Sequence, residues 1–496
     1  MEASGKMRSE LLQFKTEGHA VNRLNKKHGT EYNYLKAILL LLISTNLLIF
    51  SCHNPSPADV GWKQVPEILS HISPPTFQAE DFIITEYGAV GDGKTDCTDA
   101  FKQAIENCHA AGGGRVIVPE GIYLTGAIHL KSNVNLHIIK NAKLLFSQDT
   151  RKYLPVVFTR FEGVECMNYS PFIYAYEQEN IAITGEGTLD GQADSTIWWP
   201  WAGKSDYGWS KQTPNHNHDR EALFQMAEEG VPVAKRVFGD GHYLRVNFIQ
   251  PYKCKNILIE GITIKRSPMW EIHPVLCENV TVQNVTVISH GPNNDGCNPE
   301  SSKDVLIKNC YFDPGDDCIA IKSGRNADGR RVNIASENII IQGCTMKDGH
   351  GGVVIGSEIS GNCRNVFAED CVMDSPNLER ALRIKTNSMR GGIVENIFMR
   401  NITVGEVSDA VIRIYFHYGE GDVGQYTPIV RNINVSHITS QKSKYAFYFD
   451  GYERSPITNI NLEDCKFNDV EKGNKLNWVT GLEMKEVFIN GKLVQN

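Results

Sequence analysis

A short polar–apolar pattern recurs along the chain and predicts its architecture. An asparagine, or once an aspartate, precedes an apolar residue, any residue and a second apolar residue, and most copies lie roughly 23 to 36 residues apart. The segments are short, rich in β-branched residues and of period two, so they predict strands rather than helical repeats. The copies are Asn180–Ile183, Asn256–Ile259, Asn279–Val282, Asp304–Ile307, Asn338–Ile341, Asn365–Ala368, Asn396–Met399, Asn432–Val435 and Asn459–Leu462. Each is predicted to belong to one coil of a parallel β-helix, whose equivalent side chains stack in columns.

A second apolar strand follows in several coils and fixes which side chains face outward. The segments that align without gaps are Cys318–Lys322, Gly352–Gly356, Ala381–Lys385 and Val411–Tyr415, and the same frame is expected to fit Gly296–Glu300 and Met269–His273. Because side chains alternate along a strand, one set of positions points into the coil. Its members are Ile319, Val353, Leu382, Ile412, Ile321, Ile355, Ile384 and Ile414. The outward positions carry Lys322, Arg383, Lys385 and Arg413, which suits an acidic ligand.

Residues 80–496 are therefore predicted to form one all-β domain, a single-stranded parallel β-helix with an N-terminal capping helix. The helix is expected over residues 96–111, where apolar side chains recur on one side, with Thr98 or Asp99 as its N-cap and Gly112–Gly114 as its end. One amphipathic helix beside the first strands would cover the open end of the solenoid.

One long interruption, residues 192–250, carries Trp198, Trp199, Trp201 and Trp209 and a helical pattern near Asp219–Gln225. It is too long for an ordinary turn, and long loops in compact domains commonly have a function. A packed flap, a set of rings that stack on sugars, and a plain folded insertion all fit this composition.

The first residues carry export and anchoring signals rather than fold signals. The apolar run Ala37–Phe50 is short for a membrane span and suits a signal peptide. It leads into Ile49–Cys52, which resembles the lipobox of a bacterial lipoprotein, so residues 1–52 are predicted to be a leader with Cys52 as the lipidated residue. An ordinary cleaved signal is the alternative. Residues 53–79 are rich in Pro and Ser and predict a tether. The expected location is the periplasm or the outer membrane, and a lipid anchor would be the sole membrane contact.

The net charge and the cysteine spacing exclude some classes of protein and of binding site. The net charge is −8, so the surface as a whole is not built for nucleic acid. The 13 cysteines lack zinc-finger and CxxC spacing, and Cys310, Cys344, Cys371 and Cys465 recur at one place in their repeats. They predict a buried stack of small side chains rather than a metal site.

Three carboxylates and a histidine then stand out against the strand pattern. In the coil register, Asp295 and Asp317 share one position, while Asp316 and His350 share the preceding one together with Asn294. Adjacent residues of a flat strand face opposite ways, so a corner near Gly296 and Gly315 is needed for Asp316 and Asp317 to act together. Crowded carboxylates should keep one of their number protonated, and two or three carboxylates in a cleft are the equipment of glycoside hydrolysis.

From about Glu80 to the C-terminus the chain resembles glycoside hydrolase family 28, the polygalacturonase family. The resemblance rests on Asn293–Asp295, Gly315–Asp317, Gly349–Gly351 and Arg383–Lys385. It implies a right-handed β-helix, an inverting mechanism, and no metal or cofactor. It also implies that Asp316 is the general acid, that Asp295 and Asp317 activate water, and that His350 supports the acid. The residues that it implies bind substrate are Asn293, Lys322, Arg383, Lys385 and Tyr418, with Tyr415 as an alternative to Tyr418.

The expected activity is hydrolysis of α-1,4-galacturonosidic bonds in pectic polysaccharide or oligogalacturonides by a monomeric enzyme. The Trp-rich interruption and Lys322–Arg325 resemble exo-acting members of the family. Asn294 and Asn298 depart from the usual Thr and Asp, and Asn298 puts in doubt how Asp295 is held. A rhamnogalacturonan or xylogalacturonan hydrolase is the nearest alternative. A pectate lyase and a non-catalytic pectin-binding β-helix are more distant ones.

Overall fold

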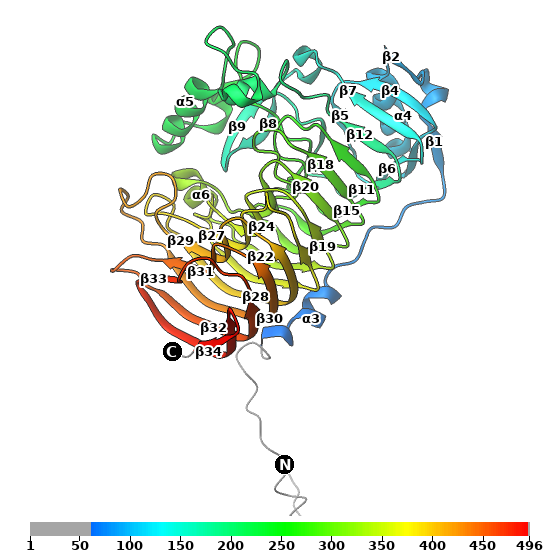
Figure 1. The fold of residues 1–496 in the computed structure, drawn as a ribbon. Coiled ribbons are helices and arrows are strands. Elements are labelled where there is room, and N and C mark those ends of the chain that lie inside the picture. Colours follow the sequence, from blue (N-terminus) through cyan, green and yellow to red (C-terminus); the bar gives the residue numbers. More distant parts are fainter. Residues whose placement is uncertain (1–60, 495–496) are drawn as a thin grey trace, which may run out of the picture. The chain divides into compact units, whose positions relative to one another are not determined.

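The computed structural model describes residues 61–494, so the predicted leader and Cys52 lie outside the described residues. Parallel strands stack coil upon coil along the chain, and the predicted all-β parallel β-helix is confirmed (Figure 1). The largest sheet has 23 strands and holds two strands of most coils, which fuse into single long strands from β28 onward. Its strands are β1 (Asp81–Ile83), β2 (Asp92–Asp96), β3 (Gly114–Val118), β4 (Gly121–Thr125), β6 (Val134–Ile138), β7 (Ala142–Phe146), β11 (Glu179–Gly185), β12 (Thr188–Asp190), β15 (Lys255–Glu260), β16 (Thr263–Lys265), β17 (Glu278–Gln283), β18 (Thr286–Ser289), β19 (Lys303–Lys308), β20 (Tyr311–Pro314), β22 (Ser336–Gln342), β23 (Thr345–Met346), β25 (Cys363–Glu369), β26 (Val372–Met373), β28 (Ile393–Glu406), β30 (Ile429–Lys442), β32 (Ile457–Phe467), β34 (Val479–Ile489) and β35 (Lys492–Val494).

The remaining face of the solenoid carries the functional clusters. Its later coils form a six-stranded parallel sheet, and its earlier coils form a three-stranded one. Isolated bridges at Ile272 and Cys297 connect the two, so the face is continuous. The strands are β5 (Ile128–His129), β10 (Ile173–Tyr176), β14 (Ile249–Tyr252), β21 (Asp317–Ile321), β24 (Gly351–Ile355), β27 (Arg380–Lys385), β29 (Ala410–Tyr415), β31 (Tyr445–Asp450) and β33 (Lys475–Asn477).

The register predicted for this face is confirmed for the later coils and wrong for one earlier segment. Ile319 pairs with Val353, Val353 with Leu382, and Leu382 with Ile412, and the side chains expected to point inward are all buried. Upstream, however, Ile272 rather than Trp270 pairs with Cys297. Met269–His273 is therefore displaced by two residues from the expected frame. No regular strand forms there, so strand periodicity could not position it.

Two side-chain columns hold neighbouring coils together. The repeated asparagines adopt positive φ angles, such as 57° at Asn338 and 58° at Asn365, and donate side-chain hydrogen bonds from one coil to the next. Cys310, Cys344 and Cys371 stack in neighbouring coils and are buried as free thiols, and Cys465 occupies the same column three coils after Cys371, with Ile402 and Ile438 between them. The predicted turn ladders and buried cysteine stack are both confirmed.

Helix α4 (Thr98–Ala110) covers the first coils as predicted. Ala100, Phe101, Ala104, Ile105 and Cys108 form its buried side. The predicted N-cap is wrong, because Cys97 is the N-cap residue and the Asp96 carboxylate accepts the hydrogen bond from the Thr98 amide at 3.0 Å. The acceptor thus lies two residues before Thr98, the first of the two predicted caps.

The long interruption is folded rather than a plain loop. Helix α5 (Asn217–Glu228) packs with a β-hairpin that leaves the solenoid earlier, and the two share a small apolar core that includes Leu223, Phe161 and Trp270. Trp198 is fully buried and joins the main core with Trp201. These two rings therefore pack the insertion onto the solenoid, and sugar stacking is not their role.

The hairpin and the short helices are β8 (Val157–Phe161), β9 (Val164–Asn168), β13 (Val237–Phe238), α6 (Asn326–Val332), and the 3-10 helices η1 (Ile84–Tyr87), η2 (Thr150–Tyr153), η3 (Trp199–Ala202), η4 (Ser205–Tyr207) and η5 (Val233–Lys235).

The predicted tether is wrong for residues 61–79. Helix α3 (Val65–Ser70) and Trp62 pack on Phe367 and Phe398, two rings that point outward from the largest sheet. Farther along, the Ser73 backbone exchanges two hydrogen bonds of 2.9 Å with the Asn279 side chain. The segment is therefore a strap bound to the outer face of several coils, and its apolar residues, hidden in a Pro- and Ser-rich sequence, explain the difference.

We expect the strap to contribute to stability, and Trp62→Ala tests this. Trp62 is 9% exposed and its ring lies 3.9 Å from the Arg400 guanidinium, so its removal should lower the free energy of unfolding by about 3 kcal/mol. Chemical denaturation of the wild-type and variant proteins measures the change. Trp478→Ala is the control, because Trp478 is half exposed and its loss should cost less than about 1 kcal/mol. Equal effects of the two substitutions would contradict a packed strap.

Candidate active site

The predicted corner exists and turns the acids toward one cavity. Strand β20 belongs to the largest sheet and β21 to the six-stranded sheet, so Gly315 and Asp316 form the turn between them. A Cβ atom at Gly315 would lie 2.4 Å from the carbonyl oxygen of Gly291 in the preceding coil. This close approach explains why glycine occupies the corner.

Backbone pairing brings the four predicted catalytic side chains together. The Gly296 amide donates to the Asp317 carbonyl at 3.0 Å, and the His350 amide donates to the Asp316 carbonyl at 3.1 Å. As a result Asp295 lies beside Asp317, and His350 lies beside Asp316. One oxygen of each of the three aspartates lies within 4.8 Å of the others. The column alignment made from the sequence is thus confirmed for these residues.

Asp317 is buried and balanced by two cations of later coils. Lys385 Nζ lies 2.6 Å from its Oδ2, and Arg383 Nη1 lies 3.4 Å from its Oδ1. Two basic groups beside one carboxylate offset its negative charge. Arg383 and Lys385 therefore lie on the face predicted from the sequence. The Asp317 carboxylate neutralises part of their positive charge.

Asp316 and His350 form a pair that shares a proton. His350 Nδ1 lies 2.9 Å from Asp316 Oδ1, and this hydrogen bond, with the aspartate charge, raises the pKa of His350 to about 9. Burial alone would raise the pKa of Asp316, but the hydrogen bond and charge of His350 lower it below its ordinary value. In the empty site at neutral pH the proton of this pair accordingly lies on the imidazole.

Asp295 carries the second proton of the site. Burial, reinforced by the charge of Asp316, raises the pKa of Asp295 to about 8. Asn298 Nδ2 donates to Asp295 Oδ2 at 2.8 Å, which answers how Asp295 is held when an amide replaces the usual acid. One of the three acids is therefore protonated at neutral pH, as crowding predicted, but it is Asp295 and not the predicted acid Asp316.

Lys322 lies in the cavity wall rather than projecting as a free cation. Its side chain is 3% exposed, its Nζ lies 3.6 Å from Asp295 Oδ2 and 3.3 Å from Glu358 Oε2, and it lies over the Trp270 ring at 4.6 Å. Burial alone would lower the pKa of Lys322, but the charges of Glu358 and Asp295 raise it. The sequence placed this lysine in an outward column, and it lines the same cavity on the outer face as Lys385 of that column.

A cavity of about 680 Å³ opens over these groups. Its walls come from the tip of the β8–β9 hairpin, helix α5, the segments that follow β21, β24, β27 and β29, and the corner loops. The lining residues are Glu162, Arg220, Trp270, Asn293, Asp295, Asp316, Asp317, Lys322, Arg325, Ser357, Glu358, Lys385, Arg390, Tyr418, Gly419 and Glu420. The two excursions from the solenoid thus reach the same cavity as the catalytic coils.

Tyr418 and Asn293, two of the predicted substrate-binding residues, are positioned by different contacts. Tyr418 lines the cavity, and Arg383 and Lys385 lie 5.5 and 5.2 Å from its ring, whereas Tyr415 contacts Arg413 farther along the sheet. Asn293 Oδ1 accepts a hydrogen bond of 2.7 Å from the buried Arg245. Of the two tyrosines considered from the sequence, Tyr418 is the one at the cavity.

Several charged residues of the cavity escaped the sequence reasoning. Arg325 and Arg390 both contact Glu420, and Arg220 pairs with Glu162 at 2.6 Å. Glu358 is buried against Lys322. All of them lie outside the aligned strands, Arg220 in helix α5 and the others on turns or loops, where column reasoning gives no position. The one available signal was the unusual charge density after each strand.

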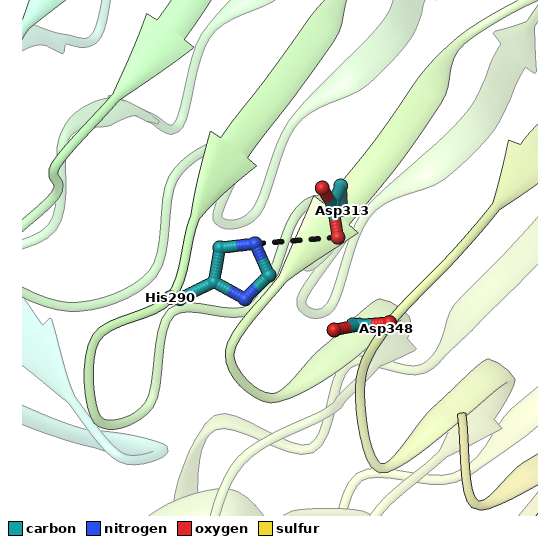
Figure 2. Close-up of side chains that lie close together, drawn as sticks. All are labelled: His290, Asp313 and Asp348. Carbon is teal, nitrogen blue, oxygen red and sulfur yellow. Dashed lines mark ion pairs between the residues drawn. The ribbon is translucent and has the colours of Figure 1, made fainter. Parts of the chain in front are cut away.

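Among residues 61–494, two groups of side chains have donor sets suited to a cation. The three aspartates are one, but Lys385, Arg383 and Lys322 already supply positive charge there. The other comprises His290, Asp313 and Asp348, on the outer side of the corners that lead to the acids (Figure 2). His290 Nε2 lies 3.3 Å from Asp313 Oδ1, and Asp348 accepts hydrogen bonds from Ser375 and Asn377. These contacts link neighbouring corners.

Comparisons with known proteins agree with this arrangement. Residues 241–488 match the model of glycosyl hydrolases family 28, and residues 82–139 match that of rhamnogalacturonase A/epimerase, pectate lyase-like. The second match contains none of the cavity residues. The chain is 29% identical to a probable polygalacturonase of Vitis vinifera, with 81% of this chain and 77% of the relative covered.

Two exo-acting proteins are also similar. An exo-poly-alpha-D-galacturonosidase of Dickeya chrysanthemi is 26% identical over 83% of this chain and 74% of its own. The crystal structure of a hyperthermoactive exopolygalacturonase from Thermotoga maritima superposes with a TM-score of 0.85 at 48% identity, over 87% of this chain and 96% of that one. The expected right-handed parallel β-helix is confirmed by these likenesses and by the observed topology.

The Asp316–His350 pair makes a prediction about proton binding. In the wild-type protein, NMR of labelled histidine should give His350 a pKa near 9, and Asp316→Asn should return it toward the ordinary value of 6.5, because the balancing charge is lost. Asp313→Asn is the matched control, since Asp313 pairs with His290 and not with His350. A His350 pKa that is the same in wild type and Asp316→Asn would show that the pair does not hold the proton.

Proposed function

The chain belongs to glycosyl hydrolases family 28, and we propose that it hydrolyses α-1,4-galacturonosidic bonds, releasing single units from the end of pectic oligosaccharides. The observation that carries this is the meeting of Asp295, Asp316 and Asp317 within 4.8 Å, beside Lys385 and Arg383. Carboxylates supply the acid and base of glycoside hydrolysis. The neighbouring cations supply partners for the carboxylate of a uronic acid, and the arginine can pair with it through two nitrogens.

Asp316 is the proposed general acid. It is the most open of the three acids, with 13% of its side chain exposed against 4% for Asp295 and 1% for Asp317. Its proton comes from His350 across the 2.9 Å hydrogen bond. An anionic sugar in the cavity opposes further negative charge on Asp316 and so favours this transfer. The acid then protonates the glycosidic oxygen as the bond to the anomeric carbon breaks.

Asp317 and Asp295 act on the attacking water. A water that hydrogen-bonds to both Asp317 and Asp295 at ordinary distances spans about 4.5 Å between their oxygens, which fits the separation of at most 4.8 Å. Asp317, with its charge balanced by Lys385, accepts the proton as the water oxygen attacks the anomeric carbon. Asp295, held by Asn298, orients the water. His350 recovers its proton from solvent, and inversion of the anomeric configuration follows from single displacement.

The excursions from the solenoid support action at chain ends. Glu162 from the β8–β9 hairpin and Arg220 from α5 both line the cavity, so it is walled on the side of the earlier coils. A closed wall beside the acids admits a terminal sugar more readily than the middle of a polymer. The relatives from Dickeya and Thermotoga, whose names describe exo action, agree with this proposal.

Export of the protein and lipidation at Cys52 are proposed from the sequence alone. The support is the apolar run Ala37–Phe50 and the lipobox-like Ile49–Cys52. Among residues 61–494, no helix is long and apolar enough to cross a membrane. A lipid on Cys52 would hold the enzyme at a bacterial outer membrane or in the periplasm.

The products formed from hexagalacturonate over time test the activity and the mode of cleavage. Galacturonic acid and pentagalacturonate should appear first, and proton NMR should show the inverted anomer of the new reducing end before mutarotation. An early mixture of dimers, trimers and tetramers would contradict exo action. An unsaturated uronide absorbing in the ultraviolet would indicate elimination instead of hydrolysis.

The companion variant Asp316→Asn separates catalysis from binding. Turnover should fall by about 10³-fold or more because the proton donor is lost, while hexagalacturonate binding stays measurable by calorimetry. Turnover close to that of wild type would refute the role of Asp316.

Metabolic labelling with a radioactive fatty acid in a bacterial host tests the anchor. The full chain should incorporate label and fractionate with membranes, and Cys52→Ala should lose the label while keeping hydrolytic activity. Unlabelled wild-type protein that is released from cells would contradict lipidation.

A further inference from the structure

We propose that Arg245, the buried arginine that contacts Asn293, is a positioning residue for the reaction. Its guanidinium fixes the orientation of the Asn293 amide, so that the amide nitrogen donates a hydrogen bond to the sugar beside the acids. The inference rests on the proposed function and deepens it. A residue of the long interruption, residues 192–250, prepares a substrate contact that a neighbouring coil provides.

Arg245 is a buried cation whose charge is not paired. Arg160, Arg236 and Arg390 are buried to the same extent, and each lies within 3.2 Å of a carboxylate oxygen. Among the residues that the structure describes, no carboxylate forms an ion pair with Arg245. Burial lowers the pKa of Arg245 to about 10, so the side chain remains charged at neutral pH. A buried charge without a partner destabilises a fold, so its presence here points to a task.

The donors of Arg245 go to the loops that lead to the acids. Nη1 donates to the Pro268 carbonyl at 3.1 Å and to the Pro292 carbonyl at 2.5 Å, and these prolines follow paired strands of neighbouring coils. Nη2 donates to Asn293 Oδ1 at 2.7 Å. Because Pro292 and Asn293 lie just before Asp295, one guanidinium holds both the start of the acid loop and a side chain of that loop.

The contact decides which end of the Asn293 amide faces the sugar. A guanidinium can only donate hydrogen bonds, so the amide oxygen must point to Arg245 and the nitrogen away from it. In the part of the chain that the structure describes, Asn293 Nδ2 has no hydrogen-bond acceptor, and the residue is partly exposed and lines the cavity. The nitrogen is therefore left as a donor for an oxygen of the bound sugar.

Two apolar cores fix the backbone around Arg245. Leu244 lies in the small core that α5 shares with the β8–β9 hairpin, and Val246 lies in the main core. Asn168 of β9 also donates a side-chain hydrogen bond of 3.2 Å to the Leu244 carbonyl. The packing of the insertion on the solenoid therefore places the guanidinium where it meets Asn293.

A double-mutant cycle tests this role, with hexagalacturonate binding measured by calorimetry in the Asp316→Asn background to prevent turnover. Arg245→Lys keeps the charge but loses the second nitrogen of the fork, so it should weaken binding about ten-fold. Asn293→Ala removes the amide and should weaken binding to a similar extent. When Asn293→Ala is already present, Arg245→Lys should weaken binding less than two-fold, because its partner is gone. Losses that multiply would overturn the proposal.

Steady-state kinetics give a second readout. In the active enzyme, Arg245→Lys should raise KM about ten-fold and leave kcat within about three-fold, because the lost contact binds the sugar and the acids stay in place. Asn293→Ala should raise KM by the same factor. An unchanged KM in Asn293→Ala would overturn the proposal even if the arginine variant did not fold.

Arg236→Lys is the matched control. Arg236 is an equally buried arginine of the insertion, but it pairs with Asp328 at 2.7 Å. Its substitution should lower the melting temperature and leave hexagalacturonate binding within two-fold. A loss of binding as large as that of Arg245→Lys would indicate a general packing effect and overturn the role of Arg245.

The outcomes for the inference and for the proposed function are distinct. If the wild-type protein binds hexagalacturonate without hydrolysing it, the proposed function is overturned and the binding cycle still decides on Arg245. If it hydrolyses the substrate and the losses multiply, Arg245 alone is overturned. Absence of binding would overturn both.

Discussion

The in-register pairing of one coil with the next is the constraint on which the rest of the structure depends. A residue's lateral neighbours are set by backbone hydrogen bonds, so Asp295, Asp317 and Gly351 occupy one column although many residues separate them. A slip of one residue would turn the isoleucines of the core outward and the acids inward. The core and the active site are therefore fixed by the same ladder, and the apolar columns that stabilise the coils also position the carboxylates.

The stacking of coils brings the carboxylates of Asp295, Asp316 and Asp317 together, and their electrostatic repulsion has to be compensated by nearby groups. Two of the three acids are buried, and each of those has a cation near it: Lys385 for Asp317 and Lys322 for Asp295. The remaining negative charge is offset by a proton on His350 and a proton on Asp295, because the pKa values of both groups are raised. In the proposed mechanism a change of charge around this pair moves the proton from His350 to Asp316. The entry of an anionic sugar supplies such a change, and this links substrate binding to the formation of the acid.

Sequence reasoning was reliable where strands are regular and failed where the chain leaves them. The aligned strands after Cys318 gave the correct columns, because a period of two and a fixed coil spacing leave one register. Met269–His273, without a regular strand, came out two residues away. Alternation placed Lys322 on the outward side, where it lines the cavity, but it did not reveal that Glu358 and Asp295 enclose the lysine there. The strap failed for another reason: the repeat pattern puts Phe367 and Phe398 at outward positions, but nothing in the sequence indicated that Trp62 covers these rings.

Chemistry and selectivity occupy separate parts of this chain. The acids come from the regular coils, and the walls of the cavity come from excursions such as the β8–β9 hairpin and α5, which can change without disturbing a coil. The buried tryptophans of the insertion belong to this division, since Trp198 fixes the insertion to the core and leaves Arg220 to reach the cavity.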